Sequence, residues 1–277
     1  MPLIRSFEEK DGVLVFDSEV DKNLSTYEAS HLETLSEIEE IHFWFQRRRD
    51  KICKAVERYV PKSSRILEIG GGTGFIASKL KHLGFEIEMA DVHSNGFDYA
   101  KQKGIDKLYQ FDLFNPPFEK EFDVICLFDV LEHLHDSLRA LECLKKMLRP
   151  HGMLLMTVPA HPWLWSRDDV IAGHACRYTK RAMKELFEQS NLKLVHARYF
   201  FSAILPLLVL RKWMRRDDGS LLKQGEIFEP KMPPALNSAL SALTKTEFCL
   251  DRFLPNFTGG SLLAVATTSG KTQRFSL

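Results

Sequence analysis

A cluster of glycines near residue 70 is the segment of this sequence best suited to hold a ligand. An apolar run over 65–69 leads into glycines at positions 70, 71, 72 and 74, and a helical pattern follows from Gly74 to about Leu83. Glycine lets the backbone turn tightly and lets a ligand approach it without a Cβ in the way. The first turn of the helix offers free N–H groups and a positive dipole end to a carboxylate or phosphate. We therefore predict a binding site at Gly70, Gly72 and Gly74.

The spacing of these glycines separates several kinds of ligand loop. The dinucleotide fingerprint G-x-G-x-x-G requires glycine at position 75, where Phe75 stands, and no Gly-Lys-Ser/Thr follows to make a P-loop. The pattern present, E-x-G-x-G-x-G from Glu68 to Gly74, resembles motif I of the class I S-adenosylmethionine-dependent methyltransferases. The resemblance implies S-adenosyl-L-methionine as the cofactor and places Glu68 in its site. A glycine-rich strand–helix turn without a ligand is the alternative.

Two further carboxylates follow the next two predicted strands. Asp91 closes the strand over 85–90, roughly 20 residues after the glycine cluster, where an acid can bind the ribose hydroxyls of a nucleoside ligand. We assign Asp91 and the adjacent Val92 to the cofactor site. The resemblance also implies an acid near the adenine amino group after the third strand, and Asp112, followed by Leu113, fits. A solvated loop aspartate is the alternative for Asp112.

The fourth predicted strand, over 122–128, ends in the segment Asp129-Val130-Leu131-Glu132-His133. This segment resembles the V-L-E-H segment of the small-molecule and lipid-quinone methyltransferases of the class. The resemblance implies that Asp129 and His133 line the cofactor cleft, at the carboxyl edge of the sheet where ligands bind in open α/β folds. In the alternative, Asp129 caps a helix, and Glu132 or His133 forms a salt bridge.

An aromatic and basic stretch precedes the glycine cluster, with arginines at 47, 48 and 49. It resembles the aromatic-plus-arginine helix of the same subgroup. In the register Trp44-x-x-x-Arg48, Arg48 would pair with the methionine carboxylate of the cofactor. A solvated helix face is the alternative, since adjacent arginines on a helix commonly face water.

The loop after the fifth strand carries the candidate catalytic residues. His161 and His174 could each act as a general base, because the imidazole pKa lies near working pH. We prefer His174, since Pro162 restricts the backbone of His161. The pattern G-H-x-x-R-Y over 173–178 resembles a bacterial subgroup of the superfamily. In the alternative, this loop is simply packed, and His174 and Arg177 fix its backbone.

One segment looks like a nucleic-acid methyltransferase motif, but its position in the chain argues against that interpretation. Residues 115–118, Asn-Pro-Pro-Phe, look like the N-P-P-[YF] motif with which nucleic-acid amino-methyltransferases clamp a flipped base. In those enzymes the motif follows strand four, whereas here it precedes the strand over 122–128. The formal net charge of +1 gives no basic footprint for nucleic acid. We therefore do not expect a nucleic-acid partner.

The elements that must position these residues alternate between strand and helix. We expect strands over 65–69, 85–90, 107–111, 122–128, 153–158, 192–199 and 261–268, with helices over 27–59, 74–83, 137–148 and 179–189. Such alternation indicates parallel βαβ units with right-handed crossovers. The predicted fold class is α/β: a Rossmann-like methyltransferase sheet, mostly parallel, of seven strands with the last antiparallel, helices on both faces and a helical insertion. We divide the chain into an extension and helix (1–60), the cofactor-binding core (61–200), a helical insertion or lid (201–258), and a final strand and tail (259–277).

Composition constrains the cellular setting. The five cysteines form no C-x-x-C pair, which argues against a disulfide framework or a zinc site and fits the cytoplasm. The first ten residues hold no apolar core of signal-peptide length. The apolar stretch over 200–210 is shorter than the ~20 residues of a membrane span. Residues 204–216, apolar and then basic, could nevertheless lie on a membrane surface; a buried helix with a snorkelling end is the alternative.

Together these features predict an S-adenosylmethionine-dependent methyltransferase. The resemblance covers about Trp44 to Tyr199 plus the final strand, and implies in-line methyl transfer to a small molecule or to a lipid- or sugar-linked acceptor. No metal ligand set stands out in the sequence. A nucleotide-binding oxidoreductase is disfavoured by Phe75. A non-catalytic module that keeps the cofactor fold is a further alternative, because fold does not fix function.

Overall fold

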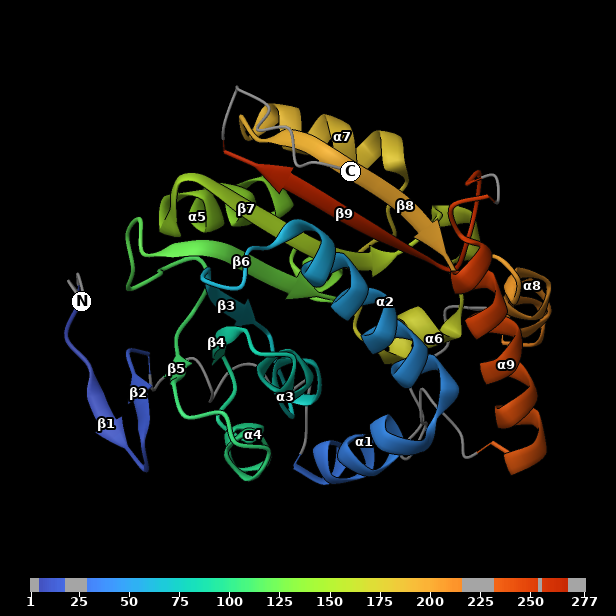
Figure 1. Ribbon diagram of the computed structural model, residues 1–277, viewed down its shortest axis with the longest axis horizontal. Coiled ribbons are helices and arrows are strands. Elements are labelled where there is room, and N and C mark those ends of the chain that lie inside the picture. The colour runs from blue at the N-terminus through green and yellow to red at the C-terminus, as the bar shows by residue number, and fades with distance from the viewer. Residues whose placement is uncertain (1–4, 18–28, 216–231, 254–255, 269–277) are drawn as a thin grey trace.

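The strands of this chain assemble into one nine-stranded sheet in the order β1-β2-β5-β4-β3-β6-β7-β9-β8 (Figure 1). The computed structural model describes residues 5–17, 29–215, 232–253 and 256–268. The strands are β1 Glu8–Lys10, β2 Val13–Val15, β3 Arg65–Ile69, β4 Glu86–Asp91, β5 Leu108–Gln110, β6 Phe122–Phe128, β7 Leu148–Pro159, β8 Lys193–Phe200 and β9 Ser261–Thr267. The helices are α1 Ala29–Ile41, α2 Phe43–Tyr59, α3 Phe75–His82, α4 Phe97–Gln102, α5 Ser137–Met147, α6 Arg167–Ile171, α7 Lys180–Gln189, α8 Leu205–Met214 and α9 Pro234–Leu250, with 3₁₀ turns η2 Leu131–His133 and η3 Pro162–Leu164.

The sheet confirms the predicted α/β class and corrects its strand count. Strands β5, β4, β3, β6 and β7 run parallel, and β9 is antiparallel to both of its neighbours. The prediction of seven strands is wrong because β1 and β2 form a hairpin that extends the sheet beyond β5. The buried side chains of Val13 and Val15 join the core there. The hairpin thus covers strand β5, whose outer N–H and C=O groups would otherwise lie unpaired.

Successive residues of the central strands feed two separate cores, one on each face of the sheet. In β3, Ile66 packs into the core that α2, α3 and α9 cover, whereas Leu67 packs into the core that α5 and α7 cover. The same alternation follows from the period of two along a strand. Helices therefore lie on both faces, as predicted (Figure 1).

The helix boundaries differ from the expectation at several places. The segment 27–59 is two helices, because His42 adopts an extended backbone and its ring caps the N–H of Trp44. Helices α4 and α6 have no predicted counterpart. Helices α8 and α9 are helical parts of the predicted insertion, and residues 216–231 lie outside the described residues. Since α9 contributes Leu240 and Phe248 to the core of α2, it packs on the sheet domain. The division at 60, 200 and 258 stays a prediction.

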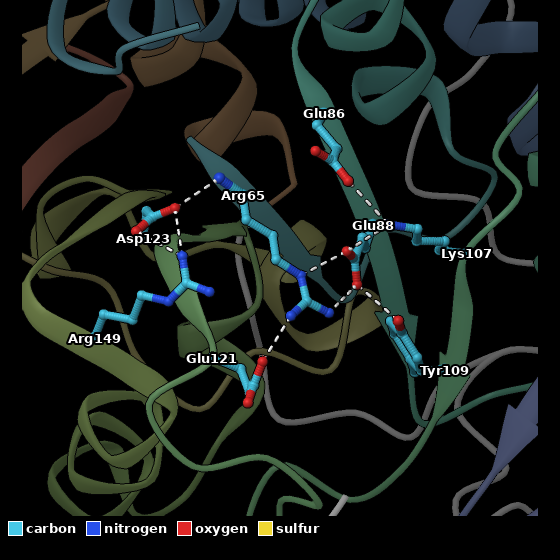
Figure 2. A network of polar contacts seen from close by, with 8 residues as sticks. All are labelled: Arg65, Glu86, Glu88, Lys107, Tyr109, Glu121, Asp123 and Arg149. Carbon is cyan, nitrogen blue, oxygen red and sulfur yellow. Dashed lines mark hydrogen bonds and ion pairs between the residues drawn. The ribbon is translucent and has the colours of Figure 1, made fainter. Parts of the chain in front are cut away.

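A polar network ties the central strands together near the start of β3, away from the glycine cluster (Figure 2). Arg65 binds both oxygens of Glu88, at 2.7 and 2.9 Å, and its remaining nitrogen donates to Glu121 at 2.7 Å. The hydroxyl of Tyr109 also donates to Glu88, at 2.7 Å. Burial works against ionisation of Glu88, yet the bonds from Arg65 and Tyr109 prevail and lower its pKa. A fully buried carboxylate is thus held ionised by its partners.

We expect the two arginines of Figure 2 to differ sharply in their contribution to stability. Arg65→Ala should cost about 3 kcal/mol or more, because it strips Glu88 of its guanidinium in a buried setting. Arg149→Ala removes a half-exposed ion pair with Asp123 and should cost at most about 1 kcal/mol. Urea denaturation of both variants measures the difference. Equal losses of unfolding free energy would show that burial of Glu88 does not govern the network.

Candidate functional site at the carboxyl edge of the sheet

The glycine turn between β3 and α3 is tightly packed except at its middle. Gly70, Gly72 and Gly74 all have positive φ, at +72°, +53° and +73°. A Cβ on Gly70 would collide with Val130, and one on Gly74 would lie 3.0 Å from Ala100. A Cβ on Gly72, in contrast, would meet nothing within 4 Å. The backbone at Gly72 is therefore the part of the turn that a ligand can approach.

Gly96 is a partner of this turn that the sequence analysis does not single out. It precedes α4, and a Cβ at this position would collide with the carbonyl of Gly72. The turn and the start of α4 consequently approach each other backbone to backbone. A glycine after the Asp91 strand is the signal that could have suggested this contact.

Asp91 lies directly against the glycine turn. Its two carboxylate oxygens accept hydrogen bonds from the backbone N–H groups of Gly72 and His93, each at 3.0 Å. Burial raises the pKa of Asp91, while these donated bonds oppose the shift. The carbonyl of Val92 accepts from Gln110 at 3.2 Å. The structure thus brings Asp91 and Val92 to the turn; their roles toward a nucleoside stay predictions.

Asp112 and Leu113 form the next loop along the sheet edge, after β5. One oxygen of Asp112 accepts from the N–H of Phe114 at 2.9 Å, and Leu113 is buried. The N–H of Asp112 donates to Asp17 at 3.1 Å, and Asp17 is itself paired with Arg5 at 2.6 Å. The N-terminal hairpin therefore braces this loop. Sequence reasoning missed Asp17, which carries no local signal beyond following the apolar run at 13–16.

Arg48 reaches into the site from α2, whereas its neighbours do not. Its Nε lies 2.5 Å from a carboxylate oxygen of Asp129, and its side chain is largely buried. Arg47 instead pairs with Asp50 at 2.9 Å, and the guanidinium of Arg49 lies over the ring of Phe75. Of the three adjacent arginines, the one that the Trp44 register favours is the one that contacts Asp129. Its role toward a cofactor stays a prediction.

Asp129 stands at the turn that leaves β6. Its φ is +57°, a conformation that non-glycine residues rarely adopt and that often marks a functional position. One oxygen faces Arg48, and the other is buried without a hydrogen-bond partner. The adjacent Val130 is the residue that packs on Gly70. Asp129 therefore connects the arginine of α2 to the glycine turn.

Buried acids surround the inner side of the turn. Glu68 is fully buried, and one of its oxygens has no hydrogen-bond partner. Burial raises the pKa of Glu68 to about 8, with a smaller opposing effect from Arg48. Glu39 of α1, which the sequence analysis did not identify, accepts a hydrogen bond from Thr73, and burial raises its pKa as well. A positively charged ligand group would compensate these carboxyl groups.

A second cluster lies where η2 meets the segment after α6. Glu132, His133 and His174 each offer a ligand atom, and these atoms lie within 4.8 Å of one another. Glu132 is fully buried with neither side-chain oxygen hydrogen-bonded, and burial together with Asp129 raises its pKa well above the ordinary value. Burial lowers the pKa of His133 to about 4. Of the described residues, these three could hold a divalent cation, although the sequence indicates no such set.

Asp169 holds His174 from the other side. One oxygen of Asp169 lies 2.8 Å from Nδ1 of His174 and 2.7 Å from Nε of Arg177. The other oxygen accepts from the backbone N–H of Ser166 at 2.8 Å, within a capping box. The Nε2 atom of His174 then faces Glu132 at 4.0 Å. Sequence reasoning missed Asp169, since it looks like an ordinary acid at a helix start.

His161 is engaged differently. Its Nε2 lies 3.1 Å from the hydroxyl of Thr258, and its ring packs between Tyr199 and Trp163. Its φ is +59°, and burial lowers its pKa. The structure therefore places the two predicted histidines in separate surroundings. A catalytic role for His161 stays a prediction, and its contacts provide no carboxylate partner of the kind that His174 has.

We expect Glu68 to make the protein less stable as the pH rises. Its pKa is about 8 in the folded chain against an ordinary value of 4.5, so the folded state binds more protons between these values. The stability that protonated Glu68 confers is present below pH 4.5 and is lost as the pH rises toward 8, by on the order of 1 kcal/mol per pH unit. Glu68→Gln should flatten this decline in denaturation curves measured at pH 5 and pH 8. The exposed Glu119→Gln is the control, and an unchanged slope in Glu68→Gln would contradict the expectation.

Comparisons with known proteins agree with this geometry. A methyltransferase domain family matches residues 43–197, more than half of the chain. A ubiquinone biosynthesis O-methyltransferase of Bartonella bacilliformis is 28% identical over 160 residues, which cover 52% of this chain and 64% of that protein. A tRNA 5-carboxymethoxyuridine methyltransferase of Escherichia coli is 33% identical over 125 residues, covering 41% and 47%. The chain thus spans less than two thirds of the curated relatives that it matches.

A solved structure shows the same fold. Phosphoethanolamine N-methyltransferase 2 of Haemonchus contortus, in complex with S-adenosyl-L-methionine, superposes with a TM-score of 0.59 at 16% identity, covering 91% of this chain and 60% of that one. The strand order, the glycine turn at the carboxyl end of β3 and the family match lead to one conclusion. The chain belongs to the class I S-adenosylmethionine-dependent methyltransferases.

Proposed function

We propose that this protein transfers the methyl group of S-adenosyl-L-methionine directly to a small molecule, or to an acceptor group carried on a lipid or sugar. The observation that carries the proposal is the juxtaposition of two features at one edge of the sheet. The open backbone of Gly72 suits the cofactor, and a histidine oriented by a buried carboxylate, His174, follows the β7 segment. The cofactor supplies an electrophilic methyl group, and the protein has to orient the acceptor and remove its proton.

The residues around the turn suit the parts of the cofactor. Arg48 would bind the methionine carboxylate, exchanging its bond to Asp129 for one to the ligand. The orphaned oxygen of buried Glu68 favours a cationic group beside it. Asp91 would bind the ribose, and the loop of Asp112 and Leu113 the adenine. In this assignment Asp129 and His133 line the cleft toward the methyl group.

The acceptor side rests on His174. With Nδ1 bonded to Asp169, the other ring nitrogen, Nε2, is the one left to accept a proton. A histidine oriented by a carboxylate at one ring nitrogen is the arrangement of a general base. Nε2 lies 4.0 Å from the carboxyl group of Glu132, so an acceptor would have to bind beside that group. Glu132, buried nearby, would face the acceptor as well.

A surface contact with a membrane belongs to the same proposal. An acceptor on a lipid would require the cytoplasmic protein to meet the bilayer through residues 204–216, of which 205–214 form α8 and residue 216 lies outside the described residues. One relative is named for ubiquinone biosynthesis and another for a tRNA nucleoside, so the comparisons leave the acceptor class open. The near-neutral charge supports the non-nucleic-acid assignment.

A side chain introduced at Gly72 tests the cofactor site. Gly72→Val should abolish binding of S-adenosylhomocysteine in calorimetry, because the side chain would occupy the open space beside the turn. Gly84→Val is a matched control, because φ is +85° and a Cβ there also meets nothing within 4 Å. Gly84 differs from Gly72 in that it follows the C-terminal end of α3, whereas the glycine turn precedes the N-terminal end. The control introduces comparable backbone strain without touching the site. Unchanged affinity in a folded Gly72→Val protein would refute the assignment.

Variants of the histidine and its carboxylate partner test the acceptor site. With methyl-tritiated S-adenosylmethionine and a bacterial extract, we expect label in the organic or small-molecule fraction. His174→Ala should lower this transfer about 100-fold or more, most strongly below the pKa of the acceptor, and leave cofactor affinity nearly intact. Asp169→Asn should lower it and shift its pH profile, whereas Asp168→Asn, which lacks a bond to His174, should not shift that profile.

Three outcomes would contradict this proposal. Label in acid-precipitable RNA would indicate a nucleic-acid acceptor, like that of the tRNA-modifying relative. Cofactor binding without transfer to any fraction would indicate a non-catalytic module. Loss of cofactor binding in His174→Ala, with normal turnover at saturating cofactor, would move His174 out of the catalytic role.

A further inference from the structure

We propose that the outer sides of α8 and α9 form a docking surface for an anionic lipid bilayer. This inference deepens the membrane contact in the proposed function and identifies the side chains that make it. The docking surface consists of the exposed apolar residues Leu207, Val209, Leu210, Trp213 and Met214 of α8, Leu236, Leu243 and Leu250 of α9, and Phe253 and Phe257 beyond it.

Helix α8 is fixed to the protein by its polar side. Both oxygens of the buried Asp168 are engaged, with Arg211 at 2.6 Å and with Arg215 at 2.8 Å. The ammonium of Lys212 donates to the carbonyl of Trp163. Of the basic residues that the sequence suggests for a membrane surface, Arg211, Lys212 and Arg215 therefore face inward as anchors, and Arg216 lies outside the described residues.

The apolar residues of α8 face outward in consequence. At 100° per residue, the five exposed apolar residues of α8 occupy one continuous side, and Arg211 and Lys212 the other. They are between 41% and 77% exposed, and α8 buries no residue fully. A surface helix of a globular protein normally turns its apolar side inward. Helix α8 differs, because Leu208 packs on the core while the opposite side of the helix also carries apolar residues, and these are exposed.

Helix α9 extends the apolar surface. Leu236, Leu243 and Leu250 recur every seven residues and so lie on one side of the helix, each close to half exposed. Glu247 fixes α9 beside the start of α8, because its oxygens accept from the N–H groups of Ser202 and Ala203 at 2.8 and 3.0 Å. Both helices lie at the same end of the molecule, opposite the N-terminal hairpin (Figure 1).

A cavity lies beside α9, next to the segment that precedes α8. It measures about 390 Å³ and is bounded by Ala203 before α8 and by Leu243 and Leu250 of α9, among other residues. Phe253 and Phe257, more than 70% exposed, follow α9. Exposed aromatic rings beside a leucine-rich face are typical of side chains that enter the interface of a bilayer.

Charge favours a bilayer over a second copy of the chain. The acids of α9 and its end, Glu247 and Asp251, are turned inward, the latter paired with Lys51 and Arg198. The exposed charges on the described parts of these helices belong to the basic Lys245 and to Arg252 beyond them. Lys245 lies about 200° around α9 from Leu243, on the opposite side of the helix. Arg252 adjoins the docking surface, because its guanidinium lies 5.5 Å from the centre of the Phe253 ring. A basic residue beside an apolar face attracts anionic lipid, whereas two such faces in a symmetric dimer would bring like charges together.

The docking surface lies on the bilayer and does not span it. No helix in the described part of the chain is long and apolar enough to cross a membrane. The ten residues of α8 extend only about 15 Å, half the thickness of the hydrocarbon core.

Vesicle sedimentation of the full chain tests the inference. The probes are vesicles of phosphatidylcholine alone and of phosphatidylcholine with about a third phosphatidylglycerol, the anionic lipid. We expect binding to the mixed vesicles and a loss of about tenfold or more in Leu210→Glu/Trp213→Glu, because both side chains would leave the apolar phase. Arg252→Glu should weaken binding to the mixed vesicles selectively, because Arg252 adjoins Phe253 of the docking surface. Phe7→Glu, an exposed apolar position at the opposite end of the sheet, should bind like the parent.

The same samples separate the other outcomes. Equal binding by the parent and Leu210→Glu/Trp213→Glu, or no binding to either vesicle, would overturn the docking surface. A dimer in light scattering that the double variant splits would assign the surface to a second copy instead. Cofactor binding by calorimetry is measured in parallel without vesicles, so failure of the proposed function is recognised separately from failure of the docking surface.

Discussion

The close packing of the turn between β3 and α3 is the constraint on which the site depends. Gly70, Gly72 and Gly74, all with left-handed backbone, form the turn at the carboxyl end of the central strand β3, and neighbouring segments pack against this turn. Val130 closes over Gly70, and Gly96 meets the carbonyl of Gly72. Any Cβ at Gly70 or Gly96 would force these segments apart. The packing leaves the middle of the turn open at Gly72, and this opening defines where a ligand can approach the turn.

The pKa values of buried carboxyl groups shift in opposite directions at the two ends of the central strands. Near the start of β3, Glu88 is completely buried and remains ionised, since Arg65 binds both of its oxygens (Figure 2). Around the glycine turn, burial instead raises the pKa of Glu39, Glu68 and Asp91. A satisfied pair holds strands together, whereas Glu68, with one buried oxygen unpaired, is costly and gains from a cationic ligand.

Helix α6 links the candidate base to the candidate membrane surface. Its adjacent acids point to different partners: Asp169 binds His174, and Asp168 binds Arg211 of α8 and Arg215 just beyond it. Both carboxylates are buried. Each would be left as an unpaired buried charge if its partner side chain moved away. The five-residue helix α6 thus connects His174 to α8.

The sequence by itself determined the features that depend on local pattern. The strands over 65–69 and 122–128 agree with the structure, because side-chain periodicity acts within a few residues. The glycine turn was equally visible, since its conformation excludes other residues. Only the tertiary structure decided which distant groups meet: the hairpin on β5, Glu39 on Thr73, Arg48 on Asp129, and Asp169 behind His174. Such contacts depend on how helices and loops dock on the sheet, and an acid at a helix start looks the same in the sequence whether it binds a histidine or faces water.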